Sequence, residues 1–231
     1  MSPRPTLLEQ HPNLEEAIKE TAWAQISTNG AASLSLRAIA RALNITAPAI
    51  YNYFSNRDAL VTALIVDAFQ SFGDAQINAI ANVPEGEHAN RLRALGLSYR
   101  QWAVTYPQRY QLIFGTPIPG YYAPQEITGP VAARGLTALV GVLDAAHRAN
   151  KLKATSEAKM SPQLESMLRA WESSRAPGVD LEVLFTALVV WGRVHGFASL
   201  EIGNQLPPFI TDAGEIYRRD VDILVSQLIG E

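Results

Sequence analysis

Cysteine is absent from this chain of 231 residues. The absence excludes a disulfide framework, a thiolate metal site and a cysteine nucleophile, and it fits a reducing compartment. The histidines, His11, His88, His147 and His195, show no metal-ligand spacing. We therefore expect neither a metal nor a cofactor.

Long apolar runs are also missing. The longest, such as Leu184–Trp191 (LFTALVVW), fall far short of the roughly 20 residues that a membrane span needs. The N-terminus, MSPRPTLLEQHPN, contains three prolines and no apolar run of signal-peptide length. With an apolar share of 48%, the chain can bury a sizeable core. We expect a cytoplasmic protein without a membrane segment.

Acidic residues are missing from one stretch of an otherwise acidic chain. The formal net charge is −3, yet residues 30–57 contain no Asp or Glu. The stretch contains, in order, Arg37, Arg41, Tyr51, Tyr53 and Arg57. A surface that lacks carboxylates and interleaves arginine with tyrosine is suited to a polyanion such as nucleic acid.

Helical spacing of apolar residues dominates, and no period-2 alternation with hairpin turns is evident. Long helices are predicted over residues 14–29, 57–81, 88–106, 131–150, 162–171, 180–205 and 211–229. Residues 115–130, rich in proline and glycine, are predicted to form a loop. We expect an all-α fold, with an N-terminal arm and helix-turn-helix head (1–56) and a helical-bundle body (57–231).

The acid-free stretch has the pattern of two short helices joined by a tight turn. Ser35 is a good N-cap for the first helix, and Asn44 tolerates the left-handed backbone that ends it. Thr46 can cap the second helix, with Pro48 in its first turn. A second helix with a small, polar and aromatic exposed face suits the major groove. On spacing alone, an amphipathic helix pair with a solvated arginine face is an open alternative.

The same residues resemble the DNA-binding head of the TetR family of transcriptional regulators. The match covers residues 13–62 and is carried by Gly30, Ser33, Ser35, Ile39-Ala40, Ile50-Tyr51-Asn52-Tyr53-Phe54, Arg57 and Leu60. Three positions depart from the family pattern: Asn44 replaces a customary Gly, Tyr53 replaces a frequent His, and alanines stand at 47 and 49 where polar residues often read bases. Direct readout would then be sparse, and DNA shape more important.

The resemblance implies a role for each matched position. Tyr51 and Tyr53 would contact phosphates, and Arg57 would take the place of a phosphate-contacting lysine. Arg37 would read a guanine, since arginine reaches O6 and N7 together. The full set of implied DNA-binding residues is Ser35, Arg37, Thr46, Ala47, Pro48, Ala49, Tyr51, Asn52, Tyr53 and Arg57.

We expect the helical body to form a dimer, which brings the helix-turn-helix heads of two subunits together. Asp180–Gln205 and Thr211–Ile229 are candidates for a dimeric four-helix bundle, the alternative being buried helices of one subunit. A second resemblance, to a TetR subfamily marked by Trp and His-Gly, is carried by Trp191, His195, Gly196, Ser199, Leu200 and Glu201, together with Tyr106–Phe114.

Aromatic residues of the body indicate a pocket for an apolar or aromatic small molecule. The candidates are Trp102, Tyr106, Tyr110, Phe114, Trp171, Trp191 and His195, each of which is otherwise a core residue. His195 is open to three interpretations: an interface or structural residue, a ligand contact, or a catalytic base. No orienting carboxylate and oxyanion hole accompany it in sequence, so an enzyme is not expected.

Together these patterns predict a homodimeric TetR-like repressor that binds a pseudo-palindromic operator in double-stranded DNA. A small apolar effector would release it. An activator is a variation that the sequence does not decide. Two alternatives belong to other classes: a helical small-molecule carrier without a DNA-reading role, and a helical-bundle enzyme that uses His195.

Overall fold

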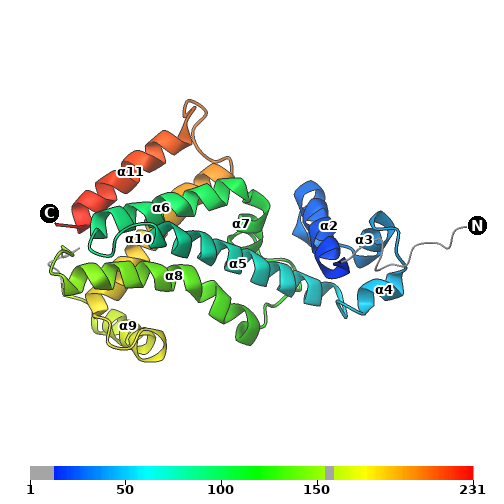
Figure 1. The fold of residues 1–231 in the computed structure, drawn as a ribbon, viewed down its shortest axis with the longest axis horizontal. Helices are drawn as coiled ribbons and strands as arrows, with labels where there is room; N and C mark the ends of the chain where they lie inside the picture. The colour runs from blue at the N-terminus through cyan, green and yellow to red at the C-terminus, as the bar shows by residue number, and fades with distance from the viewer. Residues whose placement is uncertain (1–12, 154–158, 231) are drawn as a thin grey trace, which may run out of the picture. The chain divides into compact units, whose positions relative to one another are not determined.

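The structure is a computed structural model that describes residues 13–153 and 159–230. The predicted N-terminal arm (1–12) and His11 lie outside these residues. The described residues form α-helices and one short 3-10 helix, with no β-strand, which confirms the all-α class (Figure 1). The elements are α2 (Leu14–Asn29), η1 (Ala31–Ser33), α3 (Leu36–Ala42), α4 (Ala47–Tyr51), α5 (Arg57–Ala81), α6 (His88–Thr105), α7 (Pro107–Phe114), α8 (Gln125–Arg148), α9 (Pro162–Arg175), α10 (Leu181–Ile202) and α11 (Ala213–Leu228).

The chain divides into two compact units. Unit 1 consists of the residues up to 69 together with residues 108–130, and unit 2 consists of residues 70–107 together with the residues from 131 onward. Helices α5 and α8 each begin in unit 1 and continue in unit 2. Unit 1 therefore holds the predicted helix-turn-helix and, in addition, a segment that lies far away in sequence.

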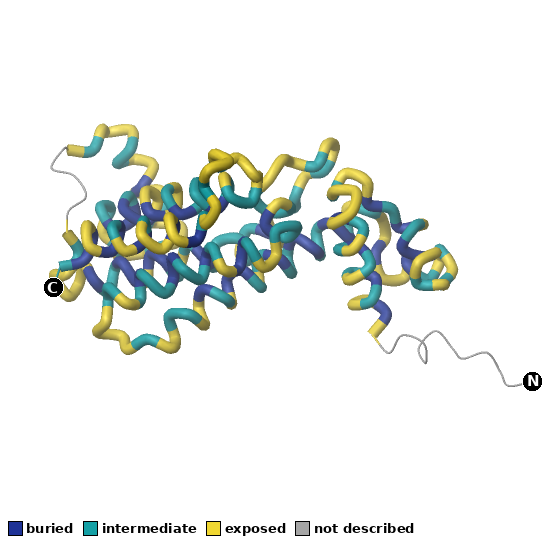
Figure 2. The backbone as a smooth tube through the Cα atoms, turned by 90° about the horizontal axis from the view of Figure 1, so that it is seen from above, coloured by how far each residue is buried: buried dark blue, intermediate teal, exposed yellow. Residues whose placement is uncertain are grey.

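Unit 1 is built around an apolar core to which each of its helices contributes one face. Helix α2 buries a row spaced by four residues, as the 3.6-residue period requires. Helices α3 and α4 add the face that the sequence predicts, and α5 adds its first two turns (Figure 2). The core residues of these helices are Leu14, Ile18, Ala22, Ile26, Leu36, Ile39, Ala40, Ile50, Phe54, Leu60, Val61, Leu64 and Ile65.

Capping residues set the ends of these helices. The side chain of Asn13 accepts a hydrogen bond from the backbone N–H of Glu16, and Gly30 ends α2 with a φ of 75°. Ser35 caps α3 by accepting from the N–H of Ala38. Asn44 follows α3 with a φ of 54°, the left-handed turn that the sequence predicts.

Unit 2 is a helical body in which α6 packs against both α10 and α11, and α10 also packs against α9 and α11 (Figure 1). The approach of α11 to α6 is close, because Tyr217 donates a hydrogen bond to the carbonyl of Gly96 at 2.7 Å. A Cβ at Gly96 would lie 3.3 Å from the side chain of Val221. Glycine at this position therefore permits the packing of the two helices.

Two helices differ from the sequence prediction. The expected loop over residues 115–130 is wrong at its end, because α8 already begins at Gln125 and includes Pro130. The N–H groups of Ile127 and Thr128 both donate to the carbonyl of Pro124, and so does the Thr128 hydroxyl. This first turn outweighs the one backbone hydrogen bond that Pro130 cannot make. Helix α9 also runs beyond the predicted Trp171, to Arg175.

Two of the described helices, α8 and α10, are long and apolar enough to cross a membrane by length and composition. This is weak evidence, since the core helix of a soluble protein passes the same test. Most of the buried residues of α10 face its neighbours within unit 2, as in a helical bundle.

Candidate nucleic-acid interface

The helix-turn-helix presents its predicted contact residues at the surface of unit 1. Arg37 is exposed in the first turn of α3, two residues after the N-cap Ser35. The backbone N–H of Ser35 donates to the side chain of Gln25 on α2 at 3.2 Å. The start of α3 is thus fixed to α2, and the Arg37 side chain extends from a defined position.

Helix α4 is short, and its predicted outer face is exposed. Ile50 and Phe54 are buried in the core, whereas Tyr51 and Tyr53 are 48% and 43% exposed. Thr46 occupies the N-cap position without making a side-chain cap hydrogen bond. The other predicted contacts, Ala47, Pro48, Ala49 and Asn52, are exposed or half-buried. The structure therefore brings the predicted base-facing and phosphate-facing residues to one exposed helix and its flanks.

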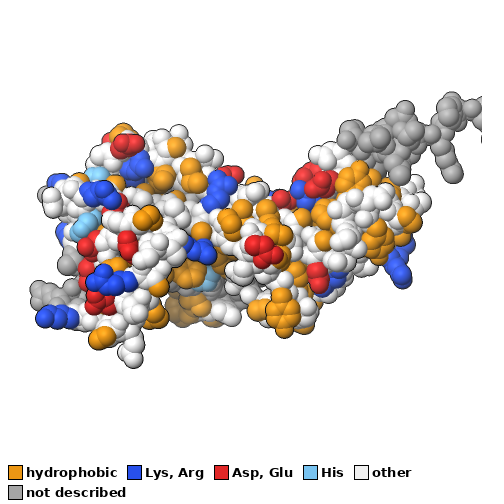
Figure 3. Space-filling view, turned by 90° about the horizontal axis from the view of Figure 1, so that it is seen from below, with side chains coloured by type: hydrophobic (Ala, Val, Ile, Leu, Met, Phe, Trp, Pro, Cys, Tyr) orange, Lys and Arg blue, Asp and Glu red, His pale blue; other side chains and the backbone are white. Residues whose placement is uncertain are grey.

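Residues 30–57, which include α3 and α4, contribute no acidic side chain to the surface of unit 1. The right-hand end of unit 1 in Figure 3 shows apolar and uncharged side chains, with basic side chains at its edge. Within the described residues, neither Arg37 nor Arg41 forms an ion pair. Such a surface lets a phosphate backbone approach without repulsion from carboxylates.

Arg57 differs from the other predicted contacts because its guanidinium is already hydrogen-bonded within unit 1. Its Nη2 donates to the backbone carbonyls of Ala31 and Ala32, each at 3.1 Å. Its Nη1 lies 3.6 Å from a carboxylate oxygen of Asp58. This arrangement was not foreseen from the sequence, since the carbonyls lie 26 and 25 residues away.

Residues 108–130 form part of unit 1 and pack against its core, which no sequence pattern indicated. Leu112, Ile113, Ile118 and Tyr121 are partly buried against the core residues. The Arg109 guanidinium lies 5.3 Å from the ring centre of Trp23, a cation–π contact between α7 and α2. The hydroxyls of Tyr121 and Thr62 lie 2.8 Å apart and form a hydrogen bond. Unit 1 is thus stabilised by contacts with a segment that lies between α6 and α8 in sequence.

The predicted ligand-binding residues fall into several groups. Tyr110 and Phe114 pack together on α7, with ring centres 5.2 Å apart, and both belong to unit 1. In unit 2, Trp102 is buried beside the more exposed Tyr106, Trp171 lies half-buried on α9, and Trp191 is 36% exposed on α10. No single site within either unit contains all seven residues.

His195 lies half-buried between α10 and α6. Its Nδ1 is 2.8 Å from the hydroxyl of Tyr99, and its Nε2 is 3.3 Å from the hydroxyl of Ser199. Burial lowers the pKa of His195 below its ordinary value, which favours the neutral ring at pH 7. Neither hydroxyl is a carboxylate of the kind that orients a catalytic histidine.

The aromatic residues around Tyr99 form the interior of unit 2. Phe72 packs edge-on against Tyr99 and Trp102, with ring centres 5.0 Å apart in both pairs. Gln76, one turn after Phe72, is 2% exposed, and its amide nitrogen has no hydrogen-bond partner among the described residues. This interior combines aromatic surface with a few polar groups, as small-molecule sites do.

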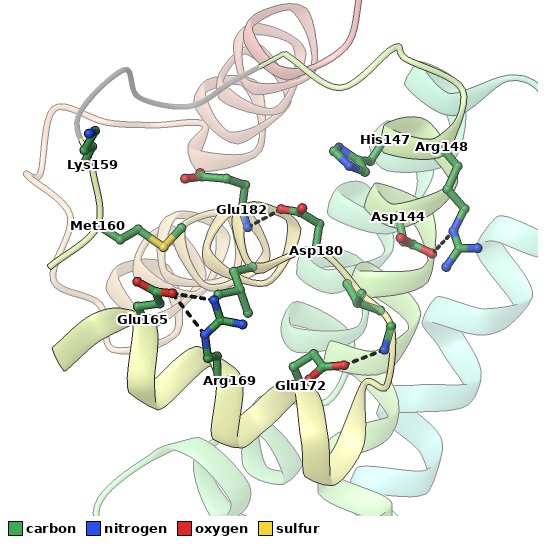
Figure 4. A pocket seen from close by; sticks show the side chains of 13 residues that line it. Asp144, His147, Arg148, Lys159, Met160, Glu165, Arg169, Glu172, Asp180 and Glu182 are labelled. Carbon is green, nitrogen blue, oxygen red and sulfur yellow. Dashed lines mark hydrogen bonds and ion pairs between the residues drawn. The ribbon is translucent and has the colours of Figure 1, made fainter. Parts of the chain in front are cut away.

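A separate open cavity of about 950 Å³ lies among α8, α9 and the start of α10 (Figure 4). Its lining is charged, and much of that charge is paired: Arg148 with Asp144, and Arg169 with Glu165. The Glu172 carboxylate accepts from the N–H of Gly178. None of the predicted ligand-binding residues lines this cavity. Its charge does not suit an apolar ligand.

Helix α10 carries an exposed apolar stripe. Leu188, Val189 and Leu200 are between 36% and 46% exposed. Gly192 and Gly196 lie on the same stripe, and no atom lies within 4 Å of a Cβ built on either. On α11, Ile216 is 37% exposed. These positions belong to the two helices that the sequence predicts to form the dimer.

Two family models match the chain. Residues 18–64 match "Bacterial regulatory proteins, tetR family", and residues 92–224 match "Tetracyclin repressor-like, C-terminal domain". The resemblance of the C-terminal residues to the Trp/His-Gly subfamily stays a prediction.

Similar proteins span almost the whole chain. The HTH-type transcriptional regulator Rv1816 of Mycobacterium tuberculosis (strain ATCC 25618 / H37Rv) is 33% identical over 216 residues, 93% of this chain and 92% of that protein. The crystal structure of the regulatory protein SCO4313 is 32% identical, with a TM-score of 0.76 over 96% of this chain and 100% of that one. A protein of unknown function from Rhodococcus sp. RHA1, 20% identical, shares the fold with a TM-score of 0.71 over 98% of this chain and 97% of its own. With a helix-turn-helix, these relatives and both family models in agreement, the chain belongs to the TetR family of transcriptional regulators, which are DNA-binding proteins and not enzymes.

Proposed function

We propose that this regulator is a cytoplasmic, homodimeric repressor that binds a pseudo-palindromic operator and is released by a small apolar effector. The observation that carries the proposal is the exposed, acid-free face of α3 and α4. It presents Arg37 on α3, and two tyrosines and small residues on α4 and directly after it, while Ile50 on the other face of α4 is buried. A helix of this kind can approach base edges closely while its neighbours contact phosphates.

The proposed DNA contacts follow from exposure and chemistry. Arg37 reads a guanine, and Tyr51 and Tyr53 contact phosphates. The hydroxyl of Thr46, which makes no cap hydrogen bond, is available to a phosphate or a base. The remaining contacts are Ser35, Ala47, Pro48, Ala49 and Asn52, and Arg57 is considered separately below.

The homodimer is proposed to form through α10 and α11. The apolar stripe on α10 would be covered by the same stripe of a second copy, as two-fold symmetry requires. Open space at Gly192 and Gly196 permits close approach of a helix at that point. Two heads on one duplex would read half-sites about 34–36 Å apart.

The effector is proposed to bind within unit 2, beside Trp102 and His195. The support is the aromatic interior around Phe72 and Tyr99, together with the buried amide of Gln76 that lacks an acceptor. An apolar or aromatic molecule with one hydrogen-bond acceptor would satisfy that donor. Tyr106, Trp171 and Trp191 are further candidates in this unit, and Tyr110 and Phe114 remain ligand-binding candidates on α7 in unit 1.

Release requires that effector binding and DNA binding oppose one another. Helix α5 belongs to both units. A shift of its C-terminal part in unit 2 can therefore move its N-terminal part, which belongs to the same unit as the helix-turn-helix. A coupling free energy of about 1–3 kcal/mol would change operator affinity by about 5- to 150-fold. By linkage, operator DNA must weaken effector binding by the same factor.

Selection of bound sites from randomised duplex DNA tests the proposal. We expect the protein to select a two-fold symmetric site. The Arg37→Ala variant should lose preference at one base pair of each half-site, whereas Tyr51→Ala should weaken binding to all sites alike. A protein that recovers no site, or an Arg37→Ala variant with unchanged preference, would contradict the proposed readout.

A further inference from the structure

Arg57 connects the start of α5 to the segment that precedes α3. Its Nη2 donates to the carbonyls of Ala31 and Ala32, both at 3.1 Å, and its side chain is 30% exposed. Both carbonyls lie in η1, the short 3-10 helix between α2 and α3. One guanidinium group therefore fixes two consecutive peptide units of this connection, as its planar arrangement of donors allows.

The other end of the same connection is fixed from α2. The backbone N–H of Ser35 donates to the Gln25 side chain at 3.2 Å, and Ser35 then caps α3. The connection formed by residues 31–35 is thus hydrogen-bonded to Arg57 of α5 at its start and to Gln25 of α2 at its end. Arg37 follows in the first turn of α3, so its position depends on how this connection is held.

The surroundings of Arg57 do not favour a phosphate contact. Asp58 places a carboxylate oxygen 3.6 Å from Nη1, and this charge would repel an approaching phosphate. Arg41 provides a contrast on α3, since it is exposed and forms no ion pair among the described residues. The two arginines carry the same charge but differ in what their guanidinium groups contact.

We propose that Arg57 is a positioning residue, which holds η1 so that Arg37 and Ser35 are presented to the operator in the correct place. It takes this role instead of contacting a phosphate. The inference rests on the proposed function, because it concerns the base readout assigned there to Arg37.

The experiment measures operator binding of the full-length protein by fluorescence anisotropy over a series of salt concentrations. Arg57→Met removes the charge and the donors while keeping an unbranched apolar stem, and Arg57→Lys keeps the charge without the guanidinium group. Arg41→Met removes one exposed guanidinium from the same unit as a matched control. The probes are the selected operator and the same duplex with a substitution at the base pair where Arg37→Ala loses preference.

The two roles predict different results. Loss of one phosphate contact per subunit should lower the slope of log K against log salt by about 1.8 for a dimer. We expect Arg57→Met to leave the slope unchanged, and Arg41→Met measures how far the slope changes when one exposed arginine charge is removed from α3. The wild type should discriminate against the substituted duplex by about 5- to 150-fold, and Arg57→Met should lose most of that ratio. Arg37→Ala should add no further loss in the Arg57→Met background.

Two outcomes would overturn the inference: a slope loss of about 1.8 in Arg57→Met, or full discrimination retained in Arg57→Met. If Arg57→Met does not fold, Arg57→Lys decides alone, since a phosphate contact tolerates lysine, whereas the lysine amine ends one bond short of the Nη2 atom that donates to both carbonyls. A wild type that selects no site removes the proposed function and the inference together. A selected site with a slope loss in Arg57→Met removes only the inference.

Discussion

Arg100 illustrates how one side chain connects three helices of unit 2. From α6 it forms two hydrogen bonds with the Glu201 carboxylate on α10, one of them 2.7 Å long. Its guanidinium lies 5.9 Å from the ring centre of Tyr217 on α11 and would be 3.0 Å from a Cβ at Gly214. Both side chains of the ion pair are only about one-fifth exposed, at 19% and 20%. A pair so placed is geometrically specific, and removing one partner leaves the other poorly solvated.

Glu201→Gln should lower the free energy of unfolding by about 1–3 kcal/mol, because the Arg100 charge loses its partner in a half-buried site. Urea denaturation measures the change. Glu215→Gln is the matched control: it removes the partner of Arg218 at an exposed position, and its midpoint should stay at the wild-type value. Equal effects of the two substitutions would contradict the structural role of Arg100.

His195 provides a prediction for pH. Burial lowers its pKa in the folded state below the ordinary value of 6.5, so the unfolded chain binds the proton more tightly. As the pH falls below about 6.5, the unfolded state gains a proton and stability decreases, until the folded-state pKa is passed. The urea midpoint should therefore fall with pH in this window, and His195→Gln should remove that component. An unchanged pH profile in His195→Gln would exclude His195 as its source.

At the scale of elements, the turn between α3 and α4 depends on Asn44. This residue stands in the left-handed region, with a φ of 54°, where the family customarily has glycine. Asn44→Ala should cost about 1 kcal/mol in unfolding free energy, and Asn44→Gly should retain the wild-type stability. Urea denaturation compares the two variants. A loss in Asn44→Gly as large as in Asn44→Ala would show that the asparagine side chain, not its backbone conformation, matters.

The sequence predicts those elements whose ends carry local signals. Asn13 and Gly30 delimit α2, and Ser35 and Asn44 delimit α3, because caps and left-handed residues act within one turn. The start of α8 could not be predicted, because a proline such as Pro130 usually indicates a loop. In the structure the helix already begins at Gln125, where the first hydrogen bonds go to the carbonyl of Pro124.

Contacts between distant segments had no such local signal. The association of residues 108–130 with the head depends on Leu112, Ile113 and Tyr121, whose partners lie far away in the chain. The same holds for Arg57. Its residue type and position predicted a phosphate contact, but no sequence signal indicated its hydrogen bond to the backbone carbonyl of Ala31. The exposed face of α4 was predictable because two buried residues, Ile50 in α4 and Phe54 just after its end, have helical spacing.

At the scale of the whole molecule, the proposed dimer is what allows the protein to bind both half-sites of an operator. Val189 lies on the α10 stripe with 46% exposure, whereas Met167 is 64% exposed on a different helix, α9. Val189→Glu should convert the dimer to a monomer, because two-fold symmetry brings both new carboxylates into the apolar interface. Sedimentation velocity measures the state, and Met167→Glu should remain dimeric. Dimers in both variants would place the interface elsewhere.

In the proposed complex, α3 and α4 of two subunits bind one duplex together. Hydroxyl-radical footprinting of the protein on its selected site tests this most directly. We expect two protected half-sites whose centres lie about 10–10.5 base pairs apart, on one face of the duplex, with both lost in Val189→Glu at the same protein concentration. A single protected half-site in the wild type, or protection that persists unchanged when Arg37 and Tyr51 are both replaced by alanine, would contradict it.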